Sequence, residues 1–140
     1  DVKVVQCKAV EELVRNSDII CTTTPSTTPV LPDDKELLRG KCIIAIGSYM
    51  PEMREIPDAV LDLVDNVYIE LPYACEESGD LSQPLASGKL TKDRVKLMHE
   101  YLVSGEKEIK EGQTTYFKSV GMGLFDVCIA QKLYEVAKEK

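Results

Sequence analysis

CIIAIGSYMPEMREI, residues 42–56, is the stretch that decides the fold of this chain. Its first five residues are apolar without interruption, and glycine, serine and proline follow soon after, which is typical of a buried strand that ends in a turn. In an open sheet with helices on both faces, ligands bind outside the carboxyl ends of the strands, where glycine lets the backbone come close. We therefore expect the chemistry of the protein at the turn that follows residue 46.

Strands and helices alternate along the rest of the chain. No two predicted strands are joined by a tight hairpin turn, so the order of elements predicts a mostly parallel sheet of about five strands with crossover helices. A polar loop is expected over residues 106–113. The predicted strands are 2–7, 19–24, 42–46, 67–71 and 114–119, and the predicted helices are 9–16, 33–38, 57–64, one or two short segments in 75–88, 91–103 and 124–138.

The last predicted helix, residues 124–138, carries apolar side chains on more than one face. A helix at the surface of a two-layer domain usually shows a narrower apolar stripe. We therefore expect another domain or a second copy of the chain to cover it, and the alternative is an ordinary helix that lies against the sheet. The apolar residues are Leu124, Phe125, Val127, Cys128, Ile129, Leu133, Tyr134 and Val136.

Composition limits the class of partner. The chain has 24 acidic and 17 basic residues and a net charge of −7, which opposes binding to nucleic acid and to anionic membranes. We see no signal peptide and no apolar run of membrane-spanning length. The five cysteines show no paired spacing, so we expect free thiols in a reducing cytoplasm. With a single histidine as well, no metal site is predicted.

A glycine-rich turn at residues 121–126, GMGLFD, almost matches the dinucleotide fingerprint GxGxxG. Asp126 replaces the third small residue and would place a carboxylate near a pyrophosphate, and only 14 residues remain after it, too few for the rest of a βαβ unit. We interpret the segment as a tight turn. If the protein uses a dinucleotide, the pyrophosphate site is missing from this chain.

The threonine block TTTPSTTP, residues 22–29, is the second candidate site. Alternation along a strand would point Thr22 and Thr24 to the same side, where their hydroxyls could reach a ribose or a substrate carboxylate. Equally, hydroxyl residues and prolines could simply form a turn. Gly47 and Ser48 would lie beside the threonines if the second and third predicted strands are neighbours.

Several charged residues near these turns receive no functional role from the sequence. Arg54 and Glu55 are predicted to be solvated surface charges, as are Glu76 and Glu77. Lys118, at the end of the last predicted strand, is ambiguous. No nucleophile with a neighbouring base can be assembled, so the catalytic residues are unassigned.

Four segments together are similar to the ornithine cyclodeaminase and mu-crystallin family: DIICTTTPSTTPVL (18–31), IIAIGSYMPEMREI (43–56), ESGDL (77–81) and TTYFKSVGMGLFD (114–126). The resemblance implies the carboxyl-terminal part of such a protein, without its glycine-rich loop. Residues 1–123 would then be the second half of a Rossmann-like, doubly wound dinucleotide-binding domain of α/β class. Residues 124–140 would form a long helix that packs on an absent domain or partner.

The resemblance also implies a cofactor and a reaction class. Members of this family bind NAD or NADP and move a hydride between the nicotinamide and a carbon that is bonded to nitrogen. They include ketimine reductases, alanine dehydrogenases and cyclodeaminases. By similarity, the cofactor-binding residues are Thr22, Thr24, Ile46, Gly47, Ser48 and Val120, and the substrate-binding residues are Tyr49 and Gly121.

Two departures from the family pattern narrow the reaction. Tyr49 stands where cyclodeaminases carry an aspartate that handles the substrate amine, and Met53 stands where they carry a cofactor-contacting lysine. A phenol with an ordinary pKa of about 10 is a poor base near neutral pH. The resemblance therefore favours an NAD(P)-dependent reductase of imines, or an amino-acid dehydrogenase, over a cyclodeaminase.

In that interpretation, this segment forms the nicotinamide side of the site and is inactive alone. The expected partners are a small imine or amino-acid substrate and a second copy of the protein. Two alternatives stay open: a binding or structural module without catalysis, and a cyclodeaminase in spite of Tyr49.

Overall fold

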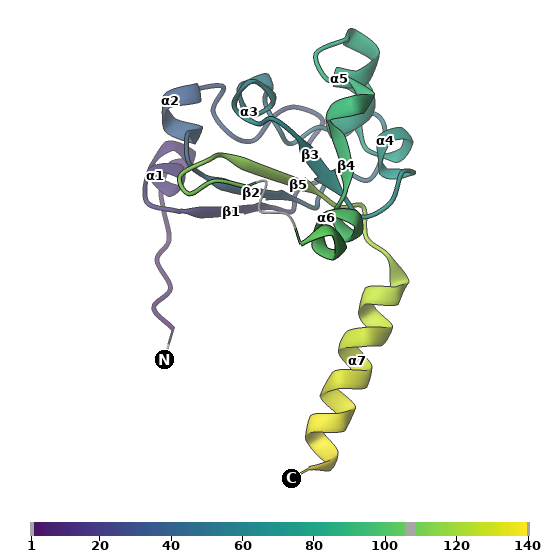
Figure 1. The fold of residues 1–140 in the computed structure, drawn as a ribbon. Coiled ribbons are helices and arrows are strands. Elements are labelled where there is room, and N and C mark those ends of the chain that lie inside the picture. The colour runs from purple at the N-terminus through teal and green to yellow at the C-terminus, as the bar shows by residue number, and fades with distance from the viewer. Residues whose placement is uncertain (1, 106–108, 140) are drawn as a thin grey trace.

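A computed structural model describes residues 2–105 and 109–139. Their strands form one parallel sheet in the order β1-β2-β5-β3-β4 (Figure 1). The strands are β1 (Ile19–Thr22), β2 (Cys42–Ala45), β3 (Val67–Ile69), β4 (Val95–Leu97) and β5 (Thr115–Lys118). The helices are α1 (Val10–Arg15), α2 (Lys35–Leu38), α3 (Asp58–Leu63), α4 (Ala74–Glu77), α5 (Gly79–Ser87), the 3-10 turn η1 (Lys92–Arg94), α6 (Met98–Ser104) and α7 (Gly123–Lys138).

Strand β2, which begins the stretch of residues 42–56, lies inside the sheet. Ile43 pairs with Ile20 of β1 on one side and with Tyr116 of β5 on the other, and all three residues are buried. The predicted parallel α/β sheet with a long final helix is therefore confirmed. The carboxyl ends of β1, β2, β3 and β5 meet at one edge, which we call the carboxyl edge.

Two predicted elements are wrong. Residues 2–7 are not a strand, because no neighbouring strand pairs with them, and Val2 and Val4 are 91% and 89% exposed. The predicted helix 91–103 is instead η1, β4 and α6 in succession, since Val95–Leu97 pairs with Val67–Ile69 of β3. Residues 106–108 of the predicted polar loop lie outside the described part of the chain.

The two faces of the sheet differ sharply. One face, the covered face, packs Ile20, Ile43 and Tyr116 against α3 and neighbouring helices to form the hydrophobic core, and Figure 1 shows α2, α3 and α5 on this side. On the opposite face, alternate residues of β1, β2 and β5 remain exposed or half-buried. This bare face consists of Ile19, Cys21, Cys42, Ile44, Thr115 and Phe117.

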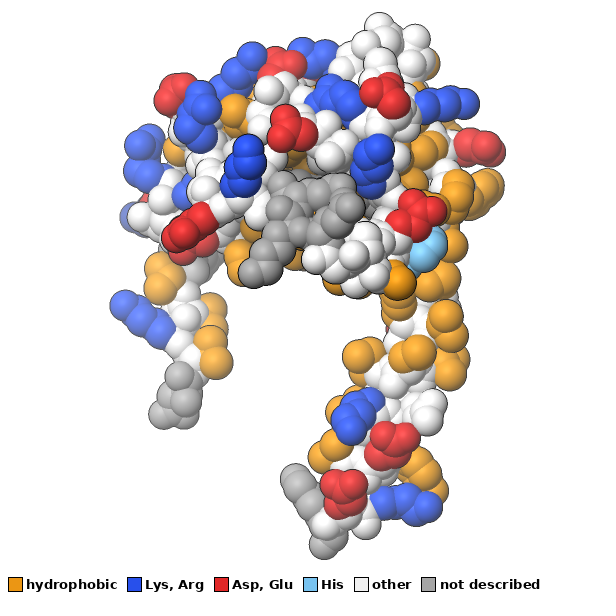
Figure 2. All heavy atoms as spheres, viewed as in Figure 1, with side chains coloured by type: hydrophobic (Ala, Val, Ile, Leu, Met, Phe, Trp, Pro, Cys, Tyr) orange, Lys and Arg blue, Asp and Glu red, His pale blue; other side chains and the backbone are white. Residues whose placement is uncertain are grey.

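Helix α7 contributes nothing to this core. None of its described residues is buried, and Figures 1 and 2 show it leading away from the sheet with hydrophobic side chains along its length. Phe125, Ile129 and Leu133 are 46%, 62% and 66% exposed. No helix in the described part of the chain is both long and apolar enough to cross a membrane.

Candidate functional site

Glu55 lies at the centre of the carboxyl edge and joins the ends of β1 and β2. Its Oε2 accepts hydrogen bonds from the Thr22 hydroxyl and the Gly47 N–H, each at 2.8 Å. Its Oε1 accepts from the N–H and the hydroxyl of Thr24, at 2.5 and 2.8 Å. The side chain is fully buried, so the carboxylate exchanges hydration for four donors from two loops.

Gly47 permits this arrangement because it leaves room for the threonine loop. A Cβ atom at residue 47 would lie 2.2 Å from the Thr24 carbonyl oxygen, 2.3 Å from the Thr24 nitrogen and 2.6 Å from Glu55 Oε1. Two of these atoms are backbone, which cannot move aside cheaply. Glycine is therefore needed here for the close approach of the threonine loop, and the predicted approach of a ligand to Gly47 stays a prediction.

Asp80 in turn holds the segment that carries Glu55. Its Oδ1 accepts hydrogen bonds from the N–H groups of Glu55 and Ile56, at 2.7 and 2.9 Å. Its Oδ2 has no hydrogen-bond partner, although the Lys118 ammonium lies 3.7 Å away. Lys118 also donates to the Ala45 carbonyl oxygen at 3.3 Å, so Asp80 and Lys118 link α5 and β5 beneath the edge.

Burial shifts the pKa values of this group. The low dielectric around Asp80 raises the pKa of its carboxyl, although the N–H of Ile56 and the Lys118 charge oppose the shift. Burial lowers the pKa of the Lys118 ammonium, against the attraction of nearby carboxylates. Tyr116, whose buried hydroxyl has no partner, has its pKa raised well above 10.0 by burial. In each case burial disfavours the charged form of the group.

Serine hydroxyls join the turn after β2 to the start of α5. The Ser48 and Ser78 hydroxyl oxygens lie 2.8 Å apart, and Ser48 also donates to the Met53 carbonyl oxygen at 2.8 Å. Gly79 packs so closely that a Cβ there would lie 2.1 Å from that same Met53 oxygen. The turn is therefore anchored from below by the ESGDL segment.

Glu70 forms a second centre, at the ends of β3 and β5. Its Oε1 accepts hydrogen bonds from the Ser119 hydroxyl at 2.8 Å and from the N–H groups of Val120 and Gly121 at 2.6 and 3.0 Å. The residue is 6% exposed, and its Oε2 is buried without a partner. Glu70 thus fixes the turn, with Gly121 at a φ of +87°, that leads into α7.

The predicted cofactor residues of the threonine block and the β2 turn lie together. Thr22 and Thr24 point to the same side, as alternation predicts, but both hydroxyls donate to Glu55. Gly47 and Ser48 are likewise bonded within the chain. The polar groups of these four residues therefore hold the loops, and their roles toward a cofactor stay predictions.

The remaining predicted site residues present surface. Ile46 and Tyr49 are 37% and 48% exposed at the end of β2. Val120 is half-buried and Gly121 exposed at the end of β5. Because β2 and β5 are neighbours, these side chains belong to one edge. Their contacts with cofactor or substrate stay predictions too.

Two of the predictions about charged residues near the edge are wrong. Glu55 is fully buried rather than solvated. The Arg54 side chain is 19% exposed, since it pairs with Asp58 and donates to the Ile56 carbonyl oxygen. Sequence reasoning also missed Glu70 and Asp80. The position of Glu70 directly after the buried strand β3 was the one local signal for it.

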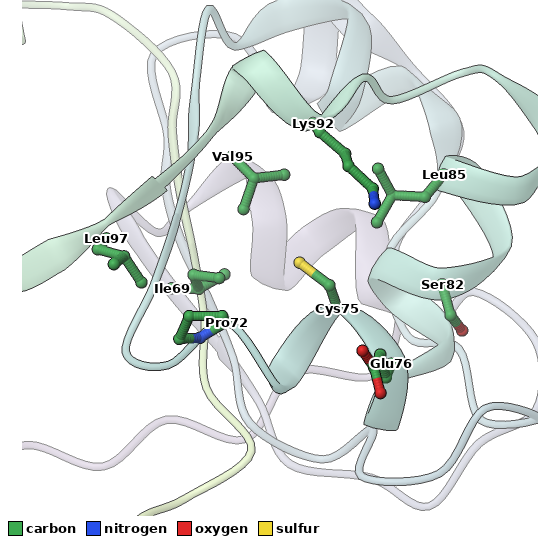
Figure 3. Close-up of a pocket in the computed structure, with 9 residues that line it drawn as sticks. All are labelled: Ile69, Pro72, Cys75, Glu76, Ser82, Leu85, Lys92, Val95 and Leu97. Atoms are coloured by element: carbon green, nitrogen blue, oxygen red, sulfur yellow. The ribbon is translucent and has the colours of Figure 1, made fainter.

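A pocket lies away from these residues. A hollow of about 600 Å³ opens between β3, β4 and the helices α4 and α5, and Figure 3 shows its mainly apolar lining with Cys75 and Lys92. Burial raises the pKa of the Cys75 thiol, which opposes a reactive thiolate. None of the predicted site residues lines it. In the described part of the chain, no group of three or more acidic, histidine or cysteine side chains could hold a metal ion.

A parallel sheet of this kind, with close-approach glycine and braced loops at its carboxyl edge, defines a protein of the Rossmann-like, doubly wound class. The chain belongs to the ornithine cyclodeaminase/mu-crystallin family, whose sequence profile matches residues 1–140. The resemblance drawn from the four sequence segments is thereby confirmed.

Three similar proteins place it within the family. Delta(1)-pyrroline-2-carboxylate reductase of Bacillus cereus is 37% identical over 132 residues, which are 92% of this chain and 40% of that protein. Ketimine reductase mu-crystallin of Rattus norvegicus is 34% identical over 135 residues, 96% of this chain and 40% of that protein. An archaeal alanine dehydrogenase dimer with bound NAD has a TM-score of 0.75 at 25% identity and covers 95% of this chain and 42% of its own.

The chain therefore spans about 40% of the length of the curated relatives it matches.

Proposed function

We propose that this chain is the nicotinamide-side segment of an NAD(P)-dependent oxidoreductase that reduces small imines, with amino-acid oxidation as the reverse chemistry. The named relatives are a pyrroline-2-carboxylate reductase and a ketimine reductase, and the alanine dehydrogenase structure contains NAD. The substrate would be a cyclic or open-chain imine. The pyrophosphate would be held by a part of the protein outside these 140 residues.

The choice of reaction rests on the exposure and hydrogen bonding of the side chains that follow β2. Cyclodeamination needs a carboxylate that handles an amine, but Tyr49 occupies the exposed position of the turn. Of the two carboxylates of the same stretch, Glu55 is buried and bonded to four donors, whereas Glu52 is exposed three residues after Tyr49. Neither Tyr49 nor Glu55 supplies a free base to the edge. Hydride addition to a preformed C=N bond does not need one there.

The edge fits a nicotinamide ring on physical grounds. Ile46 and Val120 offer apolar surface at the ends of neighbouring strands, and the packing of Gly47 against Thr24 and Glu55 holds the β2 turn in place. The bound cofactor would supply the hydride. Ile46, Gly47 and Val120 would orient the ring, Thr22, Thr24 and the buried Ser48 would support the loops beneath it, and Tyr49 and Gly121 would border the substrate.

A steady-state assay of the complete protein tests the proposal. NADH or NADPH with a cyclic ketimine carboxylate should give a decrease in absorbance at the reduced-nicotinamide band, whereas ornithine with NAD⁺ should release no ammonia. Ammonia release with proline formation would instead establish the cyclodeaminase alternative. Saturable NADH binding without turnover of any imine or amino acid would favour a binding module.

We further propose a homodimer in the cytoplasm. The exposed apolar faces of α7 and the dimeric state named for the archaeal relative support self-association. The free thiols of all five cysteines suit a reducing compartment. Sedimentation of the complete protein as a monomer at high concentration would contradict the dimer.

A further inference from the structure

The backbone N–H groups at the turn after β5 are already used within the chain. Val120 and Gly121 both direct theirs to Glu70 Oε1. A backbone turn with free N–H groups would form an anion-binding nest. With these groups consumed, Val120 and Gly121 can offer a ligand their carbonyl oxygens and the Val120 side chain.

The β1 and β2 loops repeat the arrangement. The N–H groups of Thr24 and Gly47 both point to Glu55, and Gly47 also approaches the Thr22 carbonyl oxygen at 3.3 Å. At the ends of β1 and β2, and again at the end of β5, backbone N–H groups are therefore bonded to a buried glutamate. What the four positions retain for an external group are acceptor oxygens.

The buried charged groups of the described residues are mainly carboxylates. Among the described residues, the buried ionisable carboxylates are Glu55, Glu70 and Asp80, and the one buried ammonium is that of Lys118. Lys118 lies nearest Asp80, at 3.7 Å. Glu70 also attracts the Lys118 charge, but its Oε2 is buried without a hydrogen-bond partner. Partly buried charges are only weakly screened by water and salt.

We propose that Glu70, supported by Glu55, gives the carboxyl edge an acceptor-rich, negative character that selects hydrogen-bond donors and cations and rejects anions. The inference rests on the proposed function and deepens it. A nicotinamide fits this edge in two ways, because its carboxamide NH₂ is a donor and its oxidised ring is a cation. Glu70 acts through the Val120 and Gly121 backbone and through its charge, so it is a positioning residue.

The experiment compares two dinucleotides that differ at one group. NAD⁺ carries the carboxamide, whereas nicotinic acid adenine dinucleotide carries a carboxylate in its place. Calorimetric titration of the complete protein should show weaker binding of the acid. In Glu70→Gln, the ratio of the two dissociation constants should fall by about tenfold, because one partly buried negative charge is removed.

Three controls separate this effect from a loss of structure. Glu52→Gln removes an exposed charge from the turn after β2 and should leave the ratio unchanged. Glu70→Asp keeps the charge and should keep most of the discrimination. Each variant is checked by its urea unfolding midpoint, and the ratio is compared only between variants that bind at least one dinucleotide.

The outcomes are distinguishable. If the wild-type protein binds both dinucleotides and Glu70→Gln binds both with the wild-type ratio, the inference is wrong while the proposed function stands. If the wild-type protein binds neither dinucleotide, the proposed function fails and the inference fails with it. A lowered ratio in Glu70→Gln that Glu70→Asp restores supports the inference.

Discussion

Glu55 and Glu70 occupy equivalent places in the sheet and are bonded very differently. Each stitches two neighbouring strands at their carboxyl ends, β1 with β2 for Glu55 and β3 with β5 for Glu70. Each carboxylate oxygen of Glu55 accepts two hydrogen bonds. Glu70 receives three on one oxygen and none on the other.

A carboxylate with all of its hydrogen-bond positions filled and one with a free oxygen suit different tasks at the same sheet edge. A buried carboxylate that is fully bonded stabilises the loops around it and has little left for a ligand. One that is half-bonded still holds its loop but keeps a buried oxygen without a hydrogen-bond partner, which is costly and is expected mainly where it serves a purpose. Glu55 therefore has a structural role, and the turn held by Glu70 is the one for which we propose a role toward the ligand.

Glu55→Ala gives the largest expected effect. It strips a partner from two N–H groups and two hydroxyls in a buried setting, so the free energy of unfolding should fall by about 4 kcal/mol. Urea unfolding of the complete protein measures it. Glu52→Ala, at an exposed position of the same stretch, is the control and should change stability by less than about 0.5 kcal/mol. Equal losses of unfolding free energy in both variants would show that the hydrogen bonds of Glu55 do not stabilise the loops.

Gly47→Ala tests the same centre through backbone packing. The added Cβ would collide with two backbone atoms of Thr24, so we expect a loss of about 3 kcal/mol. Gly123→Ala is the matched control, because no atom lies within 4 Å of its added Cβ and alanine favours a helix by up to about 1 kcal/mol. The control should be neutral or stabilising, and a well-tolerated Gly47→Ala would show that the threonine loop can move away.

Glu70→Ala should destabilise less than Glu55→Ala, by about 2 kcal/mol, because it orphans three donors rather than four and removes an unpaired buried oxygen at the same time. The same urea series measures it. The functional cost should be the larger one, visible as weaker dinucleotide binding. A stability loss that matches or exceeds that of Glu55→Ala would erase the contrast between the two centres.

Asp80 gives a prediction for the pH dependence of the unfolding free energy. Its folded-state pKa is raised from 3.8, mainly by burial, so the folded protein binds its proton more tightly than the unfolded chain. Its contribution to stability is then greatest below pH 3.8 and declines as the pH rises through the folded pKa. In Asp80→Asn this component is missing. The difference in unfolding free energy, wild type minus variant, should therefore fall from acid toward neutral pH, and a rise would contradict the assignment.

The regular part of the fold follows from local sequence. The apolar run at 42–46 and the alternation of strands with helices were enough to predict β2 and a parallel sheet. Val95–Leu97 was missed because three residues inside a helical pattern become a strand only through pairing with β3. Residues 2–7 show the converse, since their β propensity forms no strand without a neighbour.

The location of the site residues could be predicted from the sequence, but their hydrogen-bond partners could not. Gly47, Ser48 and the threonine hydroxyls were located from the strand ends. The sequence predicts Glu55 as a surface charge because its partners Thr22 and Thr24 lie 33 and 31 residues away. The partners of Glu70 lie about 50 residues away. No local pattern encodes such contacts, whereas burial next to a strand end brings them together.

The bare face has a practical consequence for protein engineering. The chain contains no tryptophan, and Ile44 sits half-buried in the middle of that apolar surface. A single Ile44→Trp substitution would therefore place a unique fluorophore where any segment that docks on the sheet must exclude water. In the complete protein, a blue shift of the emission of such a probe would report that another part of the protein covers this face.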